Sequence, residues 1–500
     1  MKNTKKVLSG VLALTMVASF AACGGDDTTN NNNNNSNNAN NGADTAATTE
    51  ATTTTAATVA VNTEGLQEGE QEVIESAMSQ LQDVELENKE IKWLAHYTKN
   101  PGTDGQSKGV GLEMFEQKYG GYITDYSTTW ETRFNDLSTY VLGGEGIDFW
   151  PGDDVYNFPK GVNSGMFQPI DDYIDINSAI WQNTKEGMEK FNFGGKHFSF
   201  VTQITAEQVC MYNKTTIEEN GLDDPWELYE AGNWNWDTFK GMLEEFVDEE
   251  NDLYGLDGWY YEKALWTSSG AVAVDNVDGH VVSMLDSAAV ENAENFGYEL
   301  FQKGLILNLE PFSWNIQPQF MGEGKELFLL WGSWGVNGDP STWMNKIDPD
   351  DLGIVPVPSP AGSNPYQAAT IAGYALCKGA TNPKGVALFA ECDIVAANDE
   401  GATAIANRKA KDDNKWTDEV IEHINICNDL ARQYPVYDFA AGSSTDIAAY
   451  TVDSGDVGLR APFHGTSDWA TQREALADTI GLMVQEVDNE LQAKIAEFNS

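Results

Sequence analysis

The chain is poor in basic side chains. It carries 29 Lys and Arg against 78 Asp and Glu, which gives a formal charge of −49. Nucleic acid and anionic membrane surfaces are bound by clustered Lys and Arg, so this balance argues against both as partners. A neutral or cationic ligand fits better. Alternatively, the acidic side chains serve only to keep an exported protein soluble.

Motifs that mark common metal and catalytic sites are also missing. No two of the five cysteines have C-x-x-C spacing, and the five histidines form no H-E-x-x-H. A phosphate-binding loop is excluded because Gly324-Lys325 is followed by Glu326. The sequence GSWG at 332–335 lacks the preceding glycine of a nucleophile elbow, where Trp331 stands. We therefore expect no metal, no cofactor and no catalytic residue.

A short apolar run at residues 7–22 has the character of a targeting signal. Three lysines precede it, it is too short to span a membrane comfortably, and it ends in small residues before Cys23. This ending resembles a bacterial lipoprotein signal, although Phe20 stands where such signals usually have Leu. The resemblance implies a signal peptide over 1–22, a lipid on Cys23 and a membrane-anchored protein on the extracytoplasmic face. An ordinary secretory signal and a buried helix are the alternatives.

The segment after Cys23 has low complexity. It contains an Asn run at 30–35, a Thr run at 52–55 and no aromatic residue before about residue 68, so it cannot bury enough surface to fold. We expect residues 23–87 to form a flexible tether, in which about 45 residues would reach roughly 40 Å. Apolar residues from Val73 to Val84 can line a short acidic helix near its end. All Trp residues lie at or after Trp93, which marks the globular part.

Residues 88–500 alternate between strand-like and helix-like segments. Strands are predicted at 90–97, 122–126 and 147–150, with helices between them, which is typical of a parallel sheet covered on both faces. A second series includes an extended apolar run at 203–212 and a helix that Asn235 is suited to cap. Ligands of parallel sheets bind at the carboxyl ends of the strands. Aromatic and acidic side chains follow the first three strands: Tyr97, Trp130, Trp150 and Asp153.

Seven motifs spread over residues 88–500 carry a family resemblance in their order and spacing. They are GMFQPIDDYID (165–175), GGKHFSF (194–200), MYNK (211–214), GNWNWDTF (232–239), SSGAVAVDNVDGH (268–280), FMGEGKELFLLWGSW (320–334) and NPKGVALFAE (382–391). Together they resemble extracellular solute-binding proteins of ABC importers, of the sugar-binding, maltose-binding-protein-like type. The resemblance implies an α/β fold with two lobes, a hinge and an interlobe cleft, the type II periplasmic-binding-protein architecture.

The resemblance also implies that the chain crosses between the lobes more than once. We place the first crossing near 201–207 and the return near 370–375. Lobe one then comprises 88–203 plus 370–430, and lobe two comprises 204–369 plus 431–500. The last helix should pack through one apolar stripe made of Leu476, Ile480, Met483, Val487, Leu491 and Ile495.

By the same resemblance, the protein binds a neutral oligosaccharide without catalysis. It is expected to be a monomer that delivers this ligand to the membrane permease of an ABC transporter. Aromatic rings cover the C–H faces of sugars, and carboxylates bind their hydroxyl edges. Family cleft positions match Trp150, Asp153, Trp334, Trp469 and, more loosely, Trp266. Glu207 lies one position from the family's crossover carboxylate, whereas Trp130 and Tyr97 rest on the strand-end argument alone.

Two other classes of function stay open. A secreted carbohydrate-active enzyme needs a pair of carboxylates, and this chain has many. A ferric-iron-binding lipoprotein would use the adjacent Tyr260 and Tyr261, but it would leave the abundance of aromatic residues unexplained. For each Trp, a half-buried core position is the alternative to ligand contact.

Overall fold

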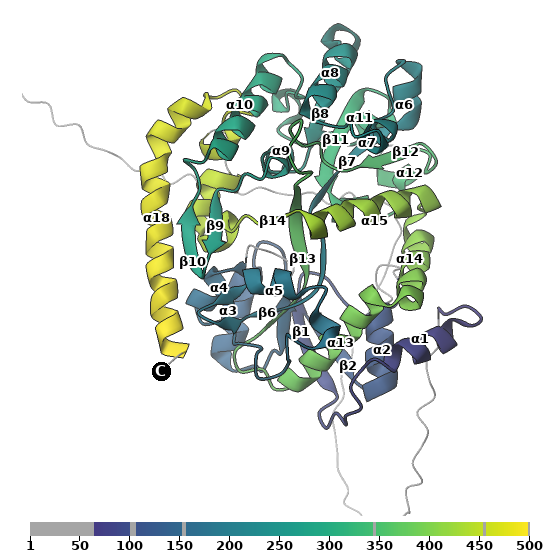
Figure 1. Ribbon diagram of the computed structural model, residues 1–500, viewed down its shortest axis with the longest axis vertical. Helices are drawn as coiled ribbons and strands as arrows, with labels where there is room; N and C mark the ends of the chain where they lie inside the picture. The colour runs from purple at the N-terminus through teal and green to yellow at the C-terminus, as the bar shows by residue number, and fades with distance from the viewer. Residues whose placement is uncertain (1–64, 101–106, 153–156, 344–346, 454–456, 499–500) are drawn as a thin grey trace, which may run out of the picture. The chain divides into compact units, whose positions relative to one another are not determined.

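The computed structural model describes residues 65–500 apart from 101–106, 153–156, 344–346, 454–456 and 499–500. The expected signal at 1–22, Cys23, most of the tether and Asp153 lie outside the described residues. The described residues belong to one unit, Val61–Ser500. Two larger sheets organise it (Figure 1).

The folded part begins before residue 88, with helix α1 (Glu70–Met78). Ile74 and Ala77 of this helix are fully buried. Arg408 donates to the two carboxylate oxygens of Glu70 at 2.7 and 2.9 Å. The predicted tether is therefore wrong for its last part, because apolar residues at helical spacing give residues 70–87 a face that packs.

Sheet one has the strand order β14-β13-β3-β1-β2, and β6 also pairs with β13. β1 (Glu90–Ala95), β2 (Tyr122–Ser127) and β3 (Phe149–Pro151) are parallel. Helices α2 (Val110–Tyr119) and α3 (Arg133–Gly143) connect them, which confirms the predicted alternation. β13 (Gln367–Leu376) runs antiparallel to β3 and β6 (Ser199–Ala206), and parallel to β14 (Pro435–Val436).

Sheet two has the order β12-β7-β11-β8. β7 (Gln208–Asn213) is antiparallel to β11 (Glu326–Gly332) and to β12 (Leu352–Val355), whereas β11 is parallel to β8 (Tyr254–Gly258). Helix α8 (Trp236–Phe246) covers this sheet. As predicted, Asn235 caps it, since its side chain accepts the backbone N–H groups of Asp237 and Thr238.

The remaining elements surround these sheets. Near sheet one the structure has α4 (Lys160–Asn163), α5 (Lys185–Lys190), β4 (Asn192–Phe193), β5 (Lys196–His197), α13 (Pro383–Asn398) and α14 (Glu400–Asn414). After β7 come α6 (Lys214–Glu219), α7 (Pro225–Glu230), α9 (Tyr261–Ser268), β9 (Val274–Val277), β10 (His280–Ser283), α10 (Ala288–Gln302), α11 (Gln319–Gly322) and α12 (Pro340–Trp343). The C-terminal part adds α15 (Asp418–Gln433), α16 (Ala440–Ser443), α17 (Thr445–Ala448) and α18 (Trp469–Phe498).

The chain crosses from sheet one to sheet two at Glu207, between β6 and β7. The predicted extended run at 203–212 thus contains the end of β6 and most of β7, which lie in different sheets. The return runs through the Pro-rich segment between β12 and β13, so residues from Gln367 onward already belong to sheet one. Both crossings therefore lie close to the expected positions, with the return a few residues earlier.

Helix α18 runs along one side of the unit and touches elements next to both sheets (Figure 1). It contacts α10, which lies between β8 and β11 of sheet two in the chain, and α4, which follows β3 of sheet one. The predicted stripe is confirmed: Ile480, Val487 and Leu491 are buried, and the other members pack partly buried against the core. The C-terminal helix therefore does not belong to the second lobe alone.

Candidate functional site

The carboxyl ends of the parallel strands in both sheets point toward Glu207. β3 runs in the same direction as β6, because both are antiparallel to β13, and β6 ends at the crossing. In sheet two, β11 ends at the same place: Gly332 is in register with Gln208, and the N–H of Ser333 donates to the carbonyl of Glu207 at 2.8 Å. Side chains that follow β1, β2, β8 and β11 therefore lie on opposite sides of one crossing.

On the sheet-two side, these positions carry clustered Trp residues. Trp334 follows β11 and is 53% exposed. Its ring meets that of Trp259, which follows β8, edge to face at 4.8 Å, and Trp331 lies 6.3 Å away. Tyr260 continues the row, 4.7 Å from Trp259. Trp334 was predicted, whereas Trp259 was missed although it has the same strand-end position.

On the sheet-one side, two predicted aromatic residues are exposed. Tyr97 follows β1 and Trp130 follows β2, with 37% and 40% of their surface exposed. His96 lies against both rings, at 5.1 and 5.3 Å. The guanidinium of Arg133 lies 3.4 Å from the centroid of Trp130, so a cation covers one face of that ring. Rings of this kind offer the apolar platform that a sugar face needs.

A cavity of about 270 Å³ opens beside Tyr97. Strand β6 contributes Thr202 and Gln203 to its lining, and α13 contributes Asp393. The Nζ of Lys99 lies 4.7 Å from the ring centroid of Tyr374, whose hydroxyl donates to Asp393. Burial raises the pKa of Asp393, although Lys99 and the Tyr374 hydrogen bond oppose this. The cavity thus combines an amine, a carboxyl group and an aromatic wall.

Glu207 forms an ion pair at the crossing. Both of its carboxylate oxygens lie 2.8 Å from Nζ of Lys263 in α9. The lysine side chain is almost completely buried, and the carboxylate is about one-fifth exposed. The predicted role of Glu207 in ligand contact stays a prediction, and the structure shows that its charge is already compensated by protein.

Three of the predicted contact residues have buried rings in this structure, and their roles in ligand contact stay predictions. The indole N–H of Trp150 donates to Oδ1 of Asn157 at 3.0 Å, and its ring packs against Phe134. Trp266 lies inside α9 and Trp469 begins α18, and both are covered by protein. In this structure these residues pack the protein and present no open face. Their strand-end or helix-start positions gave no signal of that burial.

The residues proposed for ferric iron do not form a phenolate pair at the surface. Tyr261 is buried, and burial raises its pKa well above the usual range, whereas an iron ligand must ionise readily. Among the described residues, no group of three or more His, Cys, Asp or Glu side chains could hold a metal ion. The four cysteines in the described part of the chain are free and buried.

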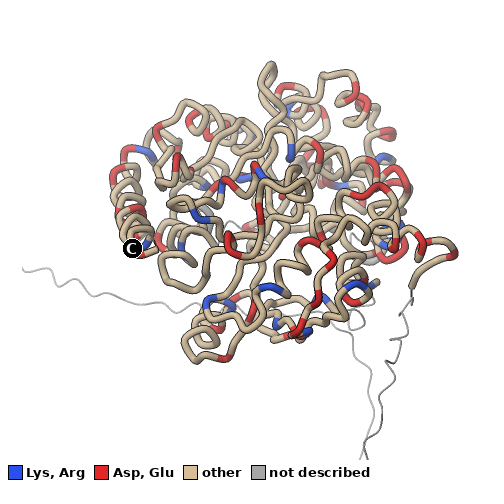
Figure 2. Tube along the Cα trace, turned by 60° about the horizontal axis from the view of Figure 1, so that its bottom comes forward, with Lys and Arg blue, Asp and Glu red and all other residues tan. Residues whose placement is uncertain are grey.

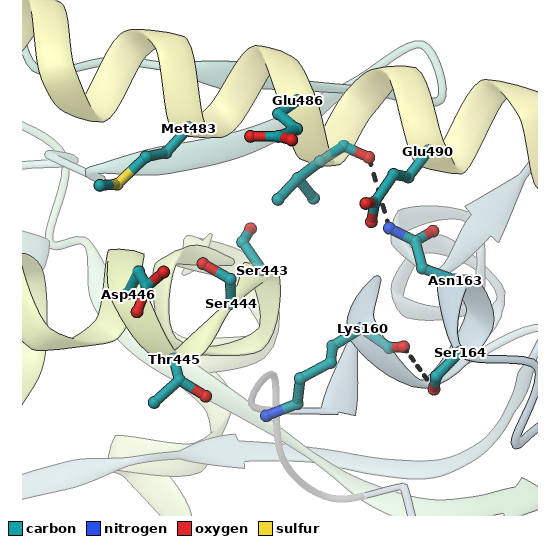
Figure 3. Close-up of a pocket in the computed structure, with 11 residues that line it drawn as sticks. Lys160, Asn163, Ser164, Ser443, Ser444, Thr445, Asp446, Met483, Glu486 and Glu490 are labelled. Atoms are coloured by element: carbon teal, nitrogen blue, oxygen red, sulfur yellow. Dashed lines mark hydrogen bonds between the residues drawn. The ribbon is translucent and has the colours of Figure 1, made fainter.

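Another cavity lies between α4, α17 and α18. It measures about 570 Å³ and is lined by hydroxyl, amide and charged side chains (Figure 3). Lys160 and Asn163 project from α4, and Glu486 and Glu490 from α18. None of the described residues that line it is aromatic. It therefore lacks the platform that would mark a sugar site.

The acidic excess is spread over the surface. Figure 2 shows Asp and Glu on most helices and loops, with Lys and Arg more sparsely between them. None of the described helices is both long and apolar enough to cross a membrane. The exposed rings of Tyr97, Trp130, Trp314 and Trp334 lie within this acidic surface.

Comparison with known proteins shows which solved structures share this fold. Protein-family models and curated proteins give no match. Solved structures match across most of the chain. An ABC substrate-binding protein from Listeria monocytogenes, in complex with cycloalternan, superimposes with a TM-score of 0.54 at 16% identity, over 81% of this chain and 99% of that one.

Two further structures give a similar result. The GacH receptor of Streptomyces glaucescens, solved unliganded and with acarbose, has a TM-score of 0.54 at 14% identity, over 79% of this chain and 98% of that one. The cyclic alpha-maltosyl-1,6-maltose binding protein from Arthrobacter globiformis has a TM-score of 0.53 at 13% identity, over 81% and 98%. These structural neighbours are sugar-binding solute-binding proteins of ABC transporters. The chain shares their type II periplasmic-binding-protein fold.

Proposed function

We propose that the protein captures a neutral carbohydrate between its two sheets, on the extracytoplasmic face of a membrane. The observation that carries this proposal is the placement of exposed aromatic residues on both sides of Glu207. Trp334 with Trp259 lies at the ends of sheet-two strands, and Tyr97 with Trp130 at the ends of sheet-one strands. A sugar ring held between such platforms buries both of its faces.

We further propose binding without turnover. A glycosidase requires two accessible carboxyl groups that flank one bond. The carboxylates near the Trp cluster are already engaged: Glu207 pairs with Lys263, and Glu262 with Arg460. Glu326 in β11 is fully buried. Incubated oligosaccharide should therefore be recovered intact.

Delivery to an ABC permease and anchoring through a lipid on Cys23 complete the proposal. Both are supported by the sequence resemblance and by the fold shared with binding proteins of ABC transporters. Ligand capture would close the lobes about the crossings, because only the ligand contacts both sides at once. The closed form would then be the form that docks on the permease.

Calorimetric titration of the mature chain against neutral oligosaccharides tests this function. Trp334→Ala should weaken binding about tenfold, since it removes one exposed platform. Tyr122→Ala is the matched control, because Tyr122 is equally exposed but lies at the amino end of β2. Absence of heat with every sugar, or hydrolysis of a bound one, would overturn the proposal. Equal affinity of wild type and Trp334→Ala would show that the cleft has been misplaced.

A further inference from the structure

The row of rings on the sheet-two side continues past Tyr260. The guanidinium of Arg460 lies 5.6 Å from the Tyr260 ring centroid. Next to it, His464 approaches Oε1 of Glu262 at 2.6 Å, the same oxygen that accepts Nε of Arg460 at 2.9 Å. The indole of Trp314 is nearly parallel to the imidazole of His464, with centroids 6.4 Å apart and planes at 23°. These contacts extend the row from Trp334 to Trp314.

Trp314 is the most exposed Trp among the described residues, at 61%. It follows Ser313, and both residues have left-handed backbone angles, with φ of 63° and 56°. Residues other than glycine rarely adopt this conformation, and two in succession persist only where the surroundings enforce them. The N–H of Trp314 donates to the carbonyl of Leu309 at 2.9 Å, which fixes the turn. The backbone conformation of Ser313 and Trp314 is therefore unfavourable for these residue types, and it holds a large apolar ring in solvent.

One buried side chain, Asp257, contacts the backbone beside Trp259 and the loop that carries Trp314. Oδ1 of Asp257 accepts the N–H of Gly258 at 2.7 Å, directly before Trp259. Oδ2 accepts the N–H of Gln317 at 2.7 Å, in the loop that carries Trp314. The Trp259 turn and the Trp314 loop are therefore held relative to each other through a single side chain.

Between Tyr260 and Trp314, the side chains of Arg460 and His464 both contact the carboxylate of Glu262. Burial of Glu262 opposes its ionisation, but Arg460 and His464 outweigh it and lower the pKa of Glu262 to about 2. The carboxylate is therefore ionised beneath the cation of Arg460. This paired set of side chains can offer N–H groups to hydroxyls without attracting an ion of either sign. A neutral, hydroxyl-rich ligand is the chemistry that fits it.

We propose that Trp314, His464 and Arg460 form an outer subsite for one further sugar ring, so that the ligand is an oligosaccharide longer than a disaccharide. This inference rests on the proposed carbohydrate function and specifies the length of its ligand. Trp314 supplies the platform for the outer ring, and Arg460 and His464 face its hydroxyl edge. The inner rings lie over Trp259 and Trp334.

The test compares affinity with chain length. Wild type, Trp314→Ala and Trp334→Ala are titrated calorimetrically with malto-, cello- and galacto-oligosaccharides of two to six residues. Trp314→Ala should weaken binding of the longer members about 3- to 10-fold and leave disaccharide binding unchanged. Trp334→Ala should weaken both. Trp314→Tyr, which keeps a ring, should restore most of the loss, and Tyr122→Ala controls for removal of an exposed aromatic residue.

The possible failures can be told apart. If wild type binds sugars but Trp314→Ala changes all lengths equally, or none, the outer subsite is wrong and the proposed function stands. If wild type binds nothing longer than a disaccharide, the inference fails in the same way. If no sugar in the three series binds to wild type, the proposed function fails and the subsite fails with it. Thermal melting of each variant verifies that its fold is retained.

Discussion

Replacement of Glu326 by Gln tests how sheet two tolerates a buried acid. Glu326 begins β11 and is completely buried, and neither carboxylate oxygen has a hydrogen-bond partner among the described residues. Burial raises its pKa well above the usual range, and the charge of Asp257 raises it further. In the folded protein the group is therefore held in its protonated form, whereas the unfolded chain ionises it near its ordinary pKa.

The sign and size of the effect follow from proton linkage. A carboxyl group whose folded pKa exceeds its unfolded value stabilises the fold fully below the unfolded pKa, and this contribution is lost as pH rises toward the folded pKa. Within that window the loss is about 1.4 kcal/mol per pH unit for one group. Between pH 5.5 and 7.5, Glu326 should therefore remove up to about 3 kcal/mol of stability from the wild type. Gln cannot ionise, so the Glu326→Gln variant does not lose this stability as pH rises.

Urea unfolding followed by Trp fluorescence, at pH 5.5, 6.5 and 7.5, measures the difference. The advantage of Glu326→Gln over wild type should grow steadily with pH across this range. Glu245→Gln, on the exposed face of α8, is the matched control for loss of one carboxylate from the same part of the chain. Parallel curves of unfolding free energy against pH for wild type and Glu326→Gln would refute the reasoning.

Three further predictions concern other parts of the molecule. Glu207→Gln removes the carboxylate that pairs with the buried amine of Lys263 and should destabilise the fold by about 3 kcal/mol in thermal denaturation, whereas an unchanged melting temperature would contradict the importance of this pair. Asn235→Ala deletes the cap of α8 and should cost about 1 kcal/mol in urea unfolding, with Asn233→Ala, on an exposed position just before the cap, as its comparison. A thiol reagent should label none of the four buried cysteines Cys210, Cys377, Cys392 and Cys427 until denaturant is added, since burial raises the pKa of each. Labelling of any of these four in the native protein would show that its thiol is accessible.

Sequence patterns predicted local structure well where periodicity and end signals agreed. The α8 helix has both an apolar face and an Asn cap, and it begins one residue after Asn235 as predicted. The apolar run at 203–212 was harder to interpret. Both halves are extended and mostly buried, so a single pattern covers β6 and β7 although they belong to different sheets. A change of sheet at Glu207 leaves no mark on local periodicity, because hydrogen-bond partners come from distant segments.

The candidate site was predicted less completely, since the same residue type serves as core and as platform. Trp150 lies within β3 and Tyr97 follows β1, both in sheet one, but only Tyr97 is exposed. The difference comes from Asn157, which accepts the indole N–H of Trp150, and from Phe134, which packs on its ring. Trp259 directly follows β8 and could have been found by the strand-end argument. Trp314 could not, because it lies in a loop whose position depends on a hydrogen bond to Asp257.

The arrangement about Glu207 explains why ring platforms, rather than charges, should select the ligand. Both chain crossings lie next to this residue, since its N–H donates to the carbonyl of Ala368, at the start of β13, at 2.8 Å. Its carboxylate is already neutralised by Lys263, and Glu262 further along the row is neutralised by Arg460. Exposed rings lie at both sheets: Tyr97 and Trp130 follow strands of sheet one, Trp334 follows β11 of sheet two, and Trp314 lies in the loop before α11. Rings discriminate by the shape of an apolar face, so the number of sugar units that contact them should set affinity more strongly than any single polar group.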